Sequence, residues 1–189
     1  EVIVPPMTFA ATANCVCLMG ATPVFVDVEP GTLLIDPKEV EARITPRTKA
    51  IIGVDYAGQP CDWDSLRVLA NKHGLALIAD SCHAIGAEYK GHKVATLADM
   101  TIFSFHPVKH ITTGEGGMIV TDDKDYSDKM RIFRSHGITT DVSTREKTGA
   151  WFYEMVDLGY NYRISDIQCA LGLSQLEKLP EWIKQRQNI

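Results

Sequence analysis

Long hydrophobic runs are missing from this 189-residue sequence. Its longest apolar segments, "AIIGVDYAG" at 50–58 and "LALIAD" at 75–80, are far shorter than the ~20 residues that a membrane-spanning helix needs. No basic segment followed by an apolar one opens the chain, so no secretory signal is predicted. We therefore expect a cytoplasmic protein without a membrane partner.

The sequence also lacks a cysteine framework and a stripe of one charge. Its five cysteines are an odd number with no C-x-x-C pair, which argues against a set of disulfides and against a structural zinc site. Lys and Arg number 19 against 24 Asp and Glu, for a net charge of −5, and the basic residues are scattered. This pattern argues against a nucleic-acid partner, and a small molecule is the expected partner.

What the sequence does contain is an alternation of short β-branched runs and longer amphipathic stretches. Such an alternation is typical of parallel strands joined by crossover helices. Asp36 and Pro37 mark the start of one helix, and Gly74 marks the end of another. We predict helices over 36–44, 61–74 and 125–137, and strands over 2–6, 22–28, 50–56, 75–80, 100–105 and 116–122.

Strands that are apolar on both faces belong in a sheet that helices cover on both sides. The predicted fold class is therefore α/β, with a mostly parallel sheet between helices, and residues 1–189 are expected to lie in one domain. The sequence starts within a strand-like run, and "LEKLPEWIKQRQNI" at 176–189 reads as a helix with no stop signal. We expect a segment of a longer chain, truncated at both ends.

Polar groups lie at or just beyond the carboxyl ends of three of the predicted strands. Asp55 comes after "IIGV", Asp80 to His83 come after "LALIA", and Ser104 to Lys109 come after "TIF". In open α/β sheets, ligands bind beyond the carboxyl ends of the strands. These three positions are therefore the first candidates for a site.

Asp80 and Lys109 carry the clearest chemistry. Asp80 follows an apolar strand directly, so its carboxylate needs a partner; the alternative is an N-cap for a helix over "SCHAIGAEY" at 81–89. Lys109 lies in "HPVKHITT", where Pro107 and the β-branched residues disfavour a regular helix. A lysine that loses solvation there can serve as an amine nucleophile; the alternative is an ordinary surface lysine.

Together these groups match the needs of pyridoxal phosphate. That cofactor takes a lysine amine for its Schiff base, a carboxylate for its pyridine nitrogen, and hydroxyl or amide donors for its phosphate. Lys109 and Asp80 offer the first two, and Ser104 offers a hydroxyl five residues before the lysine.

Three weaker signals have structural explanations. His106 and His110 have i, i+4 spacing, but the proline between them interrupts a helix and no carboxylate is correctly spaced, so no metal site is predicted. "TTGEGG" at 112–117 lacks the G-K-[ST] of a P-loop and is interpreted as a glycine turn into the next strand. Cys15 and Cys17 are expected to be small core residues of a helix.

Five long blocks of the sequence stand out beyond these single residues. The blocks are "VPPMTFAATANCVCLMGATPVFVDVEPGTLLIDP", "DSCHAIGAEYKGHKV", "FSFHPVKHITTGEGGMIVTDD", "RSHGI" and "LGYNYRISDIQCALGLSQLEKL". In order and spacing they resemble the DegT-type nucleotide-sugar aminotransferases. The likeness is strongest to the branch that aminates C4 of a UDP-4-keto-6-deoxy-N-acetylhexosamine in the pseudaminic-acid pathway.

The resemblance implies a fold and a reaction. The fold is the large domain of the type I pyridoxal-phosphate transferases, with the family's phosphate-gripping Gly-Thr segment before residue 1 and its small domain after residue 189. The reaction moves an amino group from an amino-acid donor, expected to be glutamate, to a keto-sugar nucleotide. Polysaccharide biosynthesis at the cell surface is the implied setting.

The resemblance also implies roles for residues near the cofactor ring. Lys109 matches the Schiff-base lysine, which also moves the proton as general acid and base. Asp80 matches the partner of the pyridine nitrogen. His83 lies where the family has a group near the ring's 3-oxygen, and Phe9 matches the aromatic residue that stacks on the ring. The alternatives are an ordinary half-buried histidine for His83 and a core position for Phe9.

Three further residues are implied at the cofactor's phosphate. Thr8 and Ser104 match groups beside it. Asn161, in "GYNYR", matches an asparagine that reaches the phosphate in the neighbouring subunit, which implies a homodimer with shared sites. The alternative for Asn161 is a turn residue held by its own side chain.

Two other functions stay open on the sequence. Relatives with histidine in place of the lysine use the cofactor for sugar 3-dehydration, but this chain keeps Lys109. A catalytically silent homologue that binds a ligand or a partner protein is the other, and the retention of both Asp80 and Lys109 weighs against it.

Overall fold

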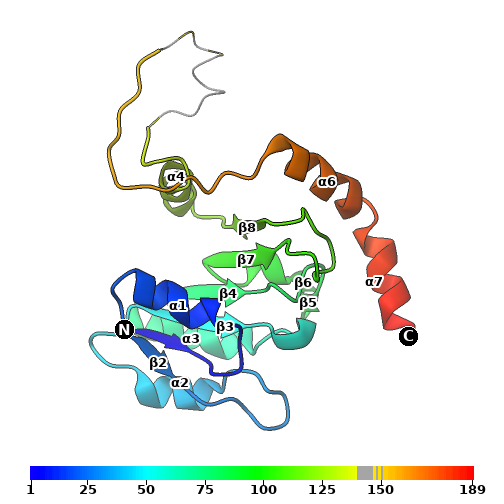
Figure 1. Cartoon of the computed structure of the whole chain (residues 1–189). Helices are drawn as coiled ribbons and strands as arrows, with labels where there is room; N and C mark the ends of the chain where they lie inside the picture. The colour runs from blue at the N-terminus through cyan, green and yellow to red at the C-terminus, as the bar shows by residue number, and fades with distance from the viewer. Residues whose placement is uncertain (140–146, 148, 150) are drawn as a thin grey trace.

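The computed structural model describes residues 1–139, 147, 149 and 151–189. Within these residues, strands join in one sheet of order β2-β1-β3-β4-β7-β8, seen at the centre of Figure 1. Every neighbouring pair is parallel except β7 with β8, which confirms the predicted α/β class with a mostly parallel sheet. The strands are β1 (Val2–Val4), β2 (Pro23–Phe25), β3 (Ala50–Val54), β4 (Ala76–Asp80), β7 (Met100–Ser104) and β8 (Gly117–Val120).

The helices in the described parts of the chain surround this sheet and extend beyond it. None of them is both long and apolar enough to cross a membrane. A two-stranded hairpin and two short 3-10 turns, Tyr56–Gly58 and Val94–Thr96, lie between β3 and β7. The helices are α1 (Ala11–Leu18), α2 (Pro37–Arg43), α3 (Trp63–His73), α4 (Lys124–Phe133), α6 (Asp166–Leu176) and α7 (Leu179–Gln187), and the hairpin is β5 (Glu88–Tyr89) with β6 (His92–Lys93).

Side-chain caps fix where the predicted helices begin. The carboxylate of Asp36 accepts from the backbone N–H of Lys38, and Asp62 does the same for Ser65 at the start of α3. Gly74 ends α3 in the left-handed region, at φ 63°. The helix expected over 125–137 is α4, which ends earlier because His136 and Gly137 have φ of 63° and 70°.

Both faces of the sheet are covered, and neighbouring strand residues alternate between them. Ile3 and Ile51 belong to the core cluster that α2 and α3 close with Val40, Trp63 and Leu66. Val4 and Ile52, the next residue in each strand, pack with Val16 of α1 on the other face. This alternation is what a parallel sheet between two helical layers requires.

Helix α1 contradicts one sequence prediction. Cys15 and Cys17 are exposed, and only Val16 between them is buried. Successive residues of a helix point about 100° apart, so a single buried residue leaves both neighbours at the edge of the buried stripe. The prediction that both thiols lie in the core is wrong.

Candidate active site

The polar groups expected at the strand ends do lie on adjacent strands. Asp80 is the last residue of β4 and is in register with Ile102 of β7, and Ser104 ends β7. The backbone N–H of Asp55, just after β3, donates to the carbonyl oxygen of Asp80 over 3.0 Å. The carboxyl ends of β3, β4 and β7 therefore form one edge of the sheet.

The carboxylate of Asp80 is held by Thr12, a residue that the sequence analysis missed. Thr12 is buried in α1 and its hydroxyl donates to Oδ2 of Asp80 over 2.9 Å. The same hydroxyl lies 2.7 Å from that of Thr8. The i, i+4 spacing of two threonines beside a predicted site residue was the available signal.

The proposed capping role of Asp80 is wrong. No helix follows it, since residues 81–87 form turns. Oδ1 of Asp80 accepts from the backbone N–H of Cys82 over 3.3 Å, which is a local turn contact. No cation pairs with this half-buried carboxylate within the part of the chain that the structure describes, so it keeps acceptor capacity for a ligand.

Lys109 lies in the irregular segment that the sequence predicted. Its backbone N–H donates to the carbonyl oxygen of His106 over 2.9 Å in a turn that follows β7. The side chain is half-buried, and its amine has no hydrogen bond or ion pair to any described residue. It is therefore more enclosed than an ordinary surface lysine, and no described carboxylate pairs with it.

Electrostatics place Asp80, Lys109 and the two residues after Asp80 in one neighbourhood. Burial raises the pKa of the Cys82 thiol to about 12, with Asp80 adding to the rise and Lys109 opposing it. Burial and the charge of Lys109 lower the pKa of His83, while Asp80 opposes that change. Both groups are therefore within range of the charges on the carboxylate and on the amine.

The structure places His83, Phe9 and Ser104 where a ligand could reach each of them. His83 meets Tyr56 edge-on, with ring centroids 6.3 Å apart. Phe9 is 78% exposed and stacks on no aromatic ring of the described chain, so the alternative of a core position is wrong. The hydroxyl oxygen of Ser104 accepts from the backbone N–H of His106 over 3.3 Å, which leaves its proton free for another acceptor.

Asn161 does not join this cluster within the chain. It is exposed and forms an isolated bridge with Ser135, just beyond α4. The bridge depends on two glycines, because a Cβ built on Gly159 would lie 2.1 Å from the backbone nitrogen of Gly137. This close backbone contact holds the segment that carries Asn161 against the chain just beyond α4.

Asp55, which was also expected at a strand end, has a structural role. Its side chain is fully buried and accepts hydrogen bonds from the N–H of Cys61, the indole of Trp63 and the hydroxyl of Ser81. Burial raises the pKa of its carboxyl, and the hydrogen bonds oppose that rise. Asp55 thus anchors Ser81, the residue next to Asp80.

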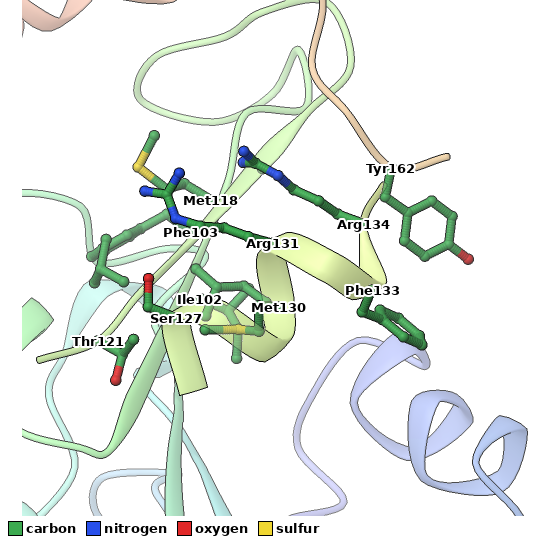
Figure 2. A pocket seen from close by; sticks show the side chains of 13 residues that line it. Ile102, Phe103, Met118, Thr121, Ser127, Met130, Arg131, Phe133, Arg134 and Tyr162 are labelled. Atoms are coloured by element: carbon green, nitrogen blue, oxygen red, sulfur yellow. The ribbon is translucent and has the colours of Figure 1, made fainter. Parts of the chain in front are cut away.

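A cavity of about 660 Å³ lies away from these groups, between α4 and the strands β7 and β8. Figure 2 shows Arg131 extending from α4 toward Met118 of β8, with Tyr162 beside Phe133. Neither Asp80 nor Lys109 lines this cavity. This cavity is therefore not part of the candidate site.

The cluster fits pyridoxal phosphate on its own chemistry. Among the residues that the structure describes, it offers a carboxylate without a cation, an amine without an acceptor, a free hydroxyl proton and an exposed aromatic ring. A protonated pyridine, an aldehyde, a phosphate and a flat ring would complement these four groups. Fold and cluster together define the class, an α/β protein with a candidate cofactor site at its strand ends.

The whole chain, residues 1–189, matches the DegT/DnrJ/EryC1/StrS aminotransferase family, and it belongs to that family. Spore coat polysaccharide biosynthesis protein SpsC of Bacillus subtilis is 44% identical over 100% of this chain and 49% of its own length. Helicobacter pylori PseC, an aminotransferase involved in the biosynthesis of pseudoaminic acid, is 43% identical with a TM-score of 0.88, over 95% of this chain and 46% of that one.

A second similar solved structure is described as the cofactor-bound form of a relative. The PLP-form of the putative sugar aminotransferase Spr1654 from Streptococcus pneumoniae is 35% identical with a TM-score of 0.90, over 100% of this chain and 51% of that one. The chain thus spans about half the length of these relatives.

Proposed function

We propose that this chain is the cofactor-binding part of a pyridoxal-phosphate-dependent aminotransferase that acts on a keto-sugar nucleotide. The observation that carries the proposal is the pair formed by Asp80 and Lys109. Both lie at the strand-end edge of one sheet, both act on Cys82 and His83, and neither has an oppositely charged partner among the described residues. Family membership supports the same reaction class.

The proposed roles follow from the contacts of each side chain. When bound, pyridoxal phosphate supplies a ring that withdraws electrons from the reacting carbon of the substrate. Asp80, oriented by Thr12, would keep the proton on the ring nitrogen. Lys109 would hold the cofactor and then, once freed, take a proton from the substrate carbon and return it.

The remaining residues would bind rather than react. Phe9 would cover one face of the ring, and His83 would lie near its 3-oxygen. Ser104 would donate its hydroxyl to the phosphate, and Thr8 would lie near the same group. Thr8 is hydrogen-bonded to the Thr12 that holds Asp80, so one pair of threonines would link the two ends of the cofactor.

The proposed acceptor is C4 of a UDP-4-keto-6-deoxy-N-acetylhexosamine, and the proposed donor is glutamate. Similarity to the pseudoaminic-acid enzyme PseC supports this acceptor. Retention of Lys109 favours amino transfer over 3-dehydration, since the dehydratase-type relatives lack that lysine.

We also propose a homodimer in which Asn161 reaches the phosphate of the partner's cofactor. Asn161 lies apart from its own chain's cluster, on a segment that exposes much apolar surface: Trp151 is 85% exposed and Leu158 is 75% exposed. An exposed apolar patch of this kind is typical of a protein interface.

The test uses the full-length protein with added pyridoxal phosphate. Lysine-bound cofactor should give a visible absorbance band that glutamate bleaches and that Lys109→Ala abolishes. Lys129→Ala, which removes an exposed lysine of α4, is the matched control and should keep the band. A full-length protein that never shows the band would contradict the proposal. Return of the band with members of a panel of UDP- and dTDP-4-ketosugars identifies the acceptor.

Shared sites have a separate test. Lys109→Ala and Asn161→Ala variants, each expected to be weakly active, are mixed and allowed to exchange subunits. A heterodimer would hold one site with both residues intact, so activity should return to a measurable fraction of the original. Mixtures that stay as inactive as the separate variants would refute the shared site without touching the aminotransferase proposal.

A further inference from the structure

A second, smaller cavity borders the candidate site and has an unusual lining. It measures about 260 Å³ and lies between the last turns of α7, the segment 83–87 and the turn at 57–58. Its walls include the side chains of His83, His110 and Arg186, and no described residue of the lining is a carboxylate. Three nitrogen-bearing basic groups therefore meet at one cavity without an acidic partner.

His110 shows that these groups lie close together. Its Nδ1 atom is buried and has no hydrogen-bond partner in the described chain. Burial lowers the pKa of His110, and the nearby Arg186, His83 and Lys109 lower it further. A buried nitrogen that finds no protein partner is rare in native structures, and it commonly marks a place where another molecule completes the hydrogen bond.

Arg186 gives the cavity its permanent charge. It lies in the last turn of α7, whose Ile183 also lines the cavity. Its guanidinium forms no ion pair with a described residue. Guanidinium groups bind carboxylates and phosphates through paired N–H donors, so an unpaired one beside two imidazoles is complementary to an oxyanion.

We propose that the cavity lined by His83, His110 and Arg186 binds an oxyanion of a substrate. The inference rests on the proposed function, because His83 joins the cavity to the neighbourhood of Lys109. Two substrates could supply the group: the amino donor through a carboxylate, and the nucleotide sugar through its diphosphate. If the amino donor and the nucleotide sugar react one after the other at a single site, each would place its oxyanion in the cavity in turn.

Binding to cofactor-free, full-length protein tests the inference without relying on activity. Glutarate, a dicarboxylate that has no amine to transfer, and UDP are titrated separately by calorimetry. Arg186→Gln should weaken binding of at least one probe by about tenfold or more, as expected for loss of a charge-assisted hydrogen bond. Arg186→Lys, which keeps the charge but not the paired donors, should lie in between.

The matched control is Lys184→Gln, which removes an exposed cation of the same helix that does not line the cavity. It should leave both affinities unchanged. An effect of Arg186→Gln on glutarate alone assigns the cavity to the donor carboxylate, and an effect on UDP alone assigns it to the diphosphate. If neither probe binds, or if Arg186→Gln binds both as well as the original protein does, the inference is overturned.

Failure of the proposed function would look different. The visible band of lysine-bound cofactor would then be absent in the original protein, whatever the titrations show. A protein with the band and with unchanged probe affinities in Arg186→Gln would keep its function and lose the oxyanion cavity.

Discussion

Replacement of Asp55 separates the contribution of its hydrogen bonds from the cost of its buried charge. Oδ1 accepts two N–H donors, from the backbone of Cys61 at 2.9 Å and from the indole of Trp63 at 3.0 Å. Oδ2 accepts the hydroxyl of Ser81 at 2.6 Å. The two N–H donors point in fixed directions, whereas the hydroxyl can turn.

Two substitutions should therefore behave very differently. Asp55→Ala leaves three buried donors without an acceptor, and each such donor costs about 1–3 kcal/mol, so the free energy of unfolding should fall by about 3 kcal/mol or more. Asp55→Asn keeps a carbonyl oxygen for both N–H groups, and its amide can donate to a Ser81 hydroxyl that has turned to accept. We expect Asp55→Asn to stay within about 1 kcal/mol of the original at pH 7.

The change of stability with pH provides a second test of the same reasoning. Burial raises the pKa of Asp55 above its ordinary value of 3.8. A raised pKa means that the carboxyl's contribution to stability is fully present below 3.8 and is lost as the pH rises through the folded-state value. Asp55→Asn has no such loss, so its stability relative to the original should improve as the pH rises above 3.8.

Urea denaturation of the full-length protein at several pH values, followed by tryptophan fluorescence, measures all three proteins. The reasoning is refuted if Asp55→Ala is no less stable than Asp55→Asn. It is also refuted if Asp55→Asn loses stability relative to the original as the pH rises.

Three other changes have a clear direction. A Cβ on Gly53 would lie 2.9 Å from the buried ring of Trp63, so Gly53→Ala should lower the free energy of unfolding by about 1–3 kcal/mol in a denaturant titration. Gly159→Ala cannot keep the contact with Gly137, so the segment that carries Asn161 should shift and the binding of pyridoxal phosphate should weaken. Unchanged cofactor affinity would contradict this. Burial and nearby basic groups lower the pKa of His110, so as the pH falls the unfolded chain protonates this histidine before the folded chain does. Melting temperature should therefore fall as the pH drops below about 6.5, less steeply in His110→Gln.

The sequence was most informative where one residue acts on its own backbone. Asp36 and Asp62 cap the helices that follow them, and Gly74 ends α3 with a positive φ. These effects need no knowledge of the rest of the chain, so helix starts and strand ends could be predicted, and with them the strand-end edge that holds Asp80 and Ser104.

Contacts between distant segments could not be predicted in the same way. Thr12 and Asp80 are 68 residues apart, and only the packing of α1 on the sheet brings the hydroxyl within 2.9 Å of the carboxylate. The exposed positions of Cys15 and Cys17 also follow from that packing. The lining of the cavity at His83, His110 and Arg186 also depends on packing, since only folding brings α7 close to His110.

Asp55 and Asp80 show why position at a strand end does not by itself identify a ligand-binding carboxylate. Each follows an apolar strand, and their strands are neighbours in the sheet. Asp55 is completely enclosed and gives its oxygens to three protein donors. Asp80 stays partly open, takes one hydroxyl and one long backbone contact, and lies within the electrostatic range of the Lys109 amine, which has no partner among the described residues. A carboxylate with spare acceptor sites beside an unpaired lysine can serve a cofactor, whereas a satisfied and buried one can only hold the edge in place.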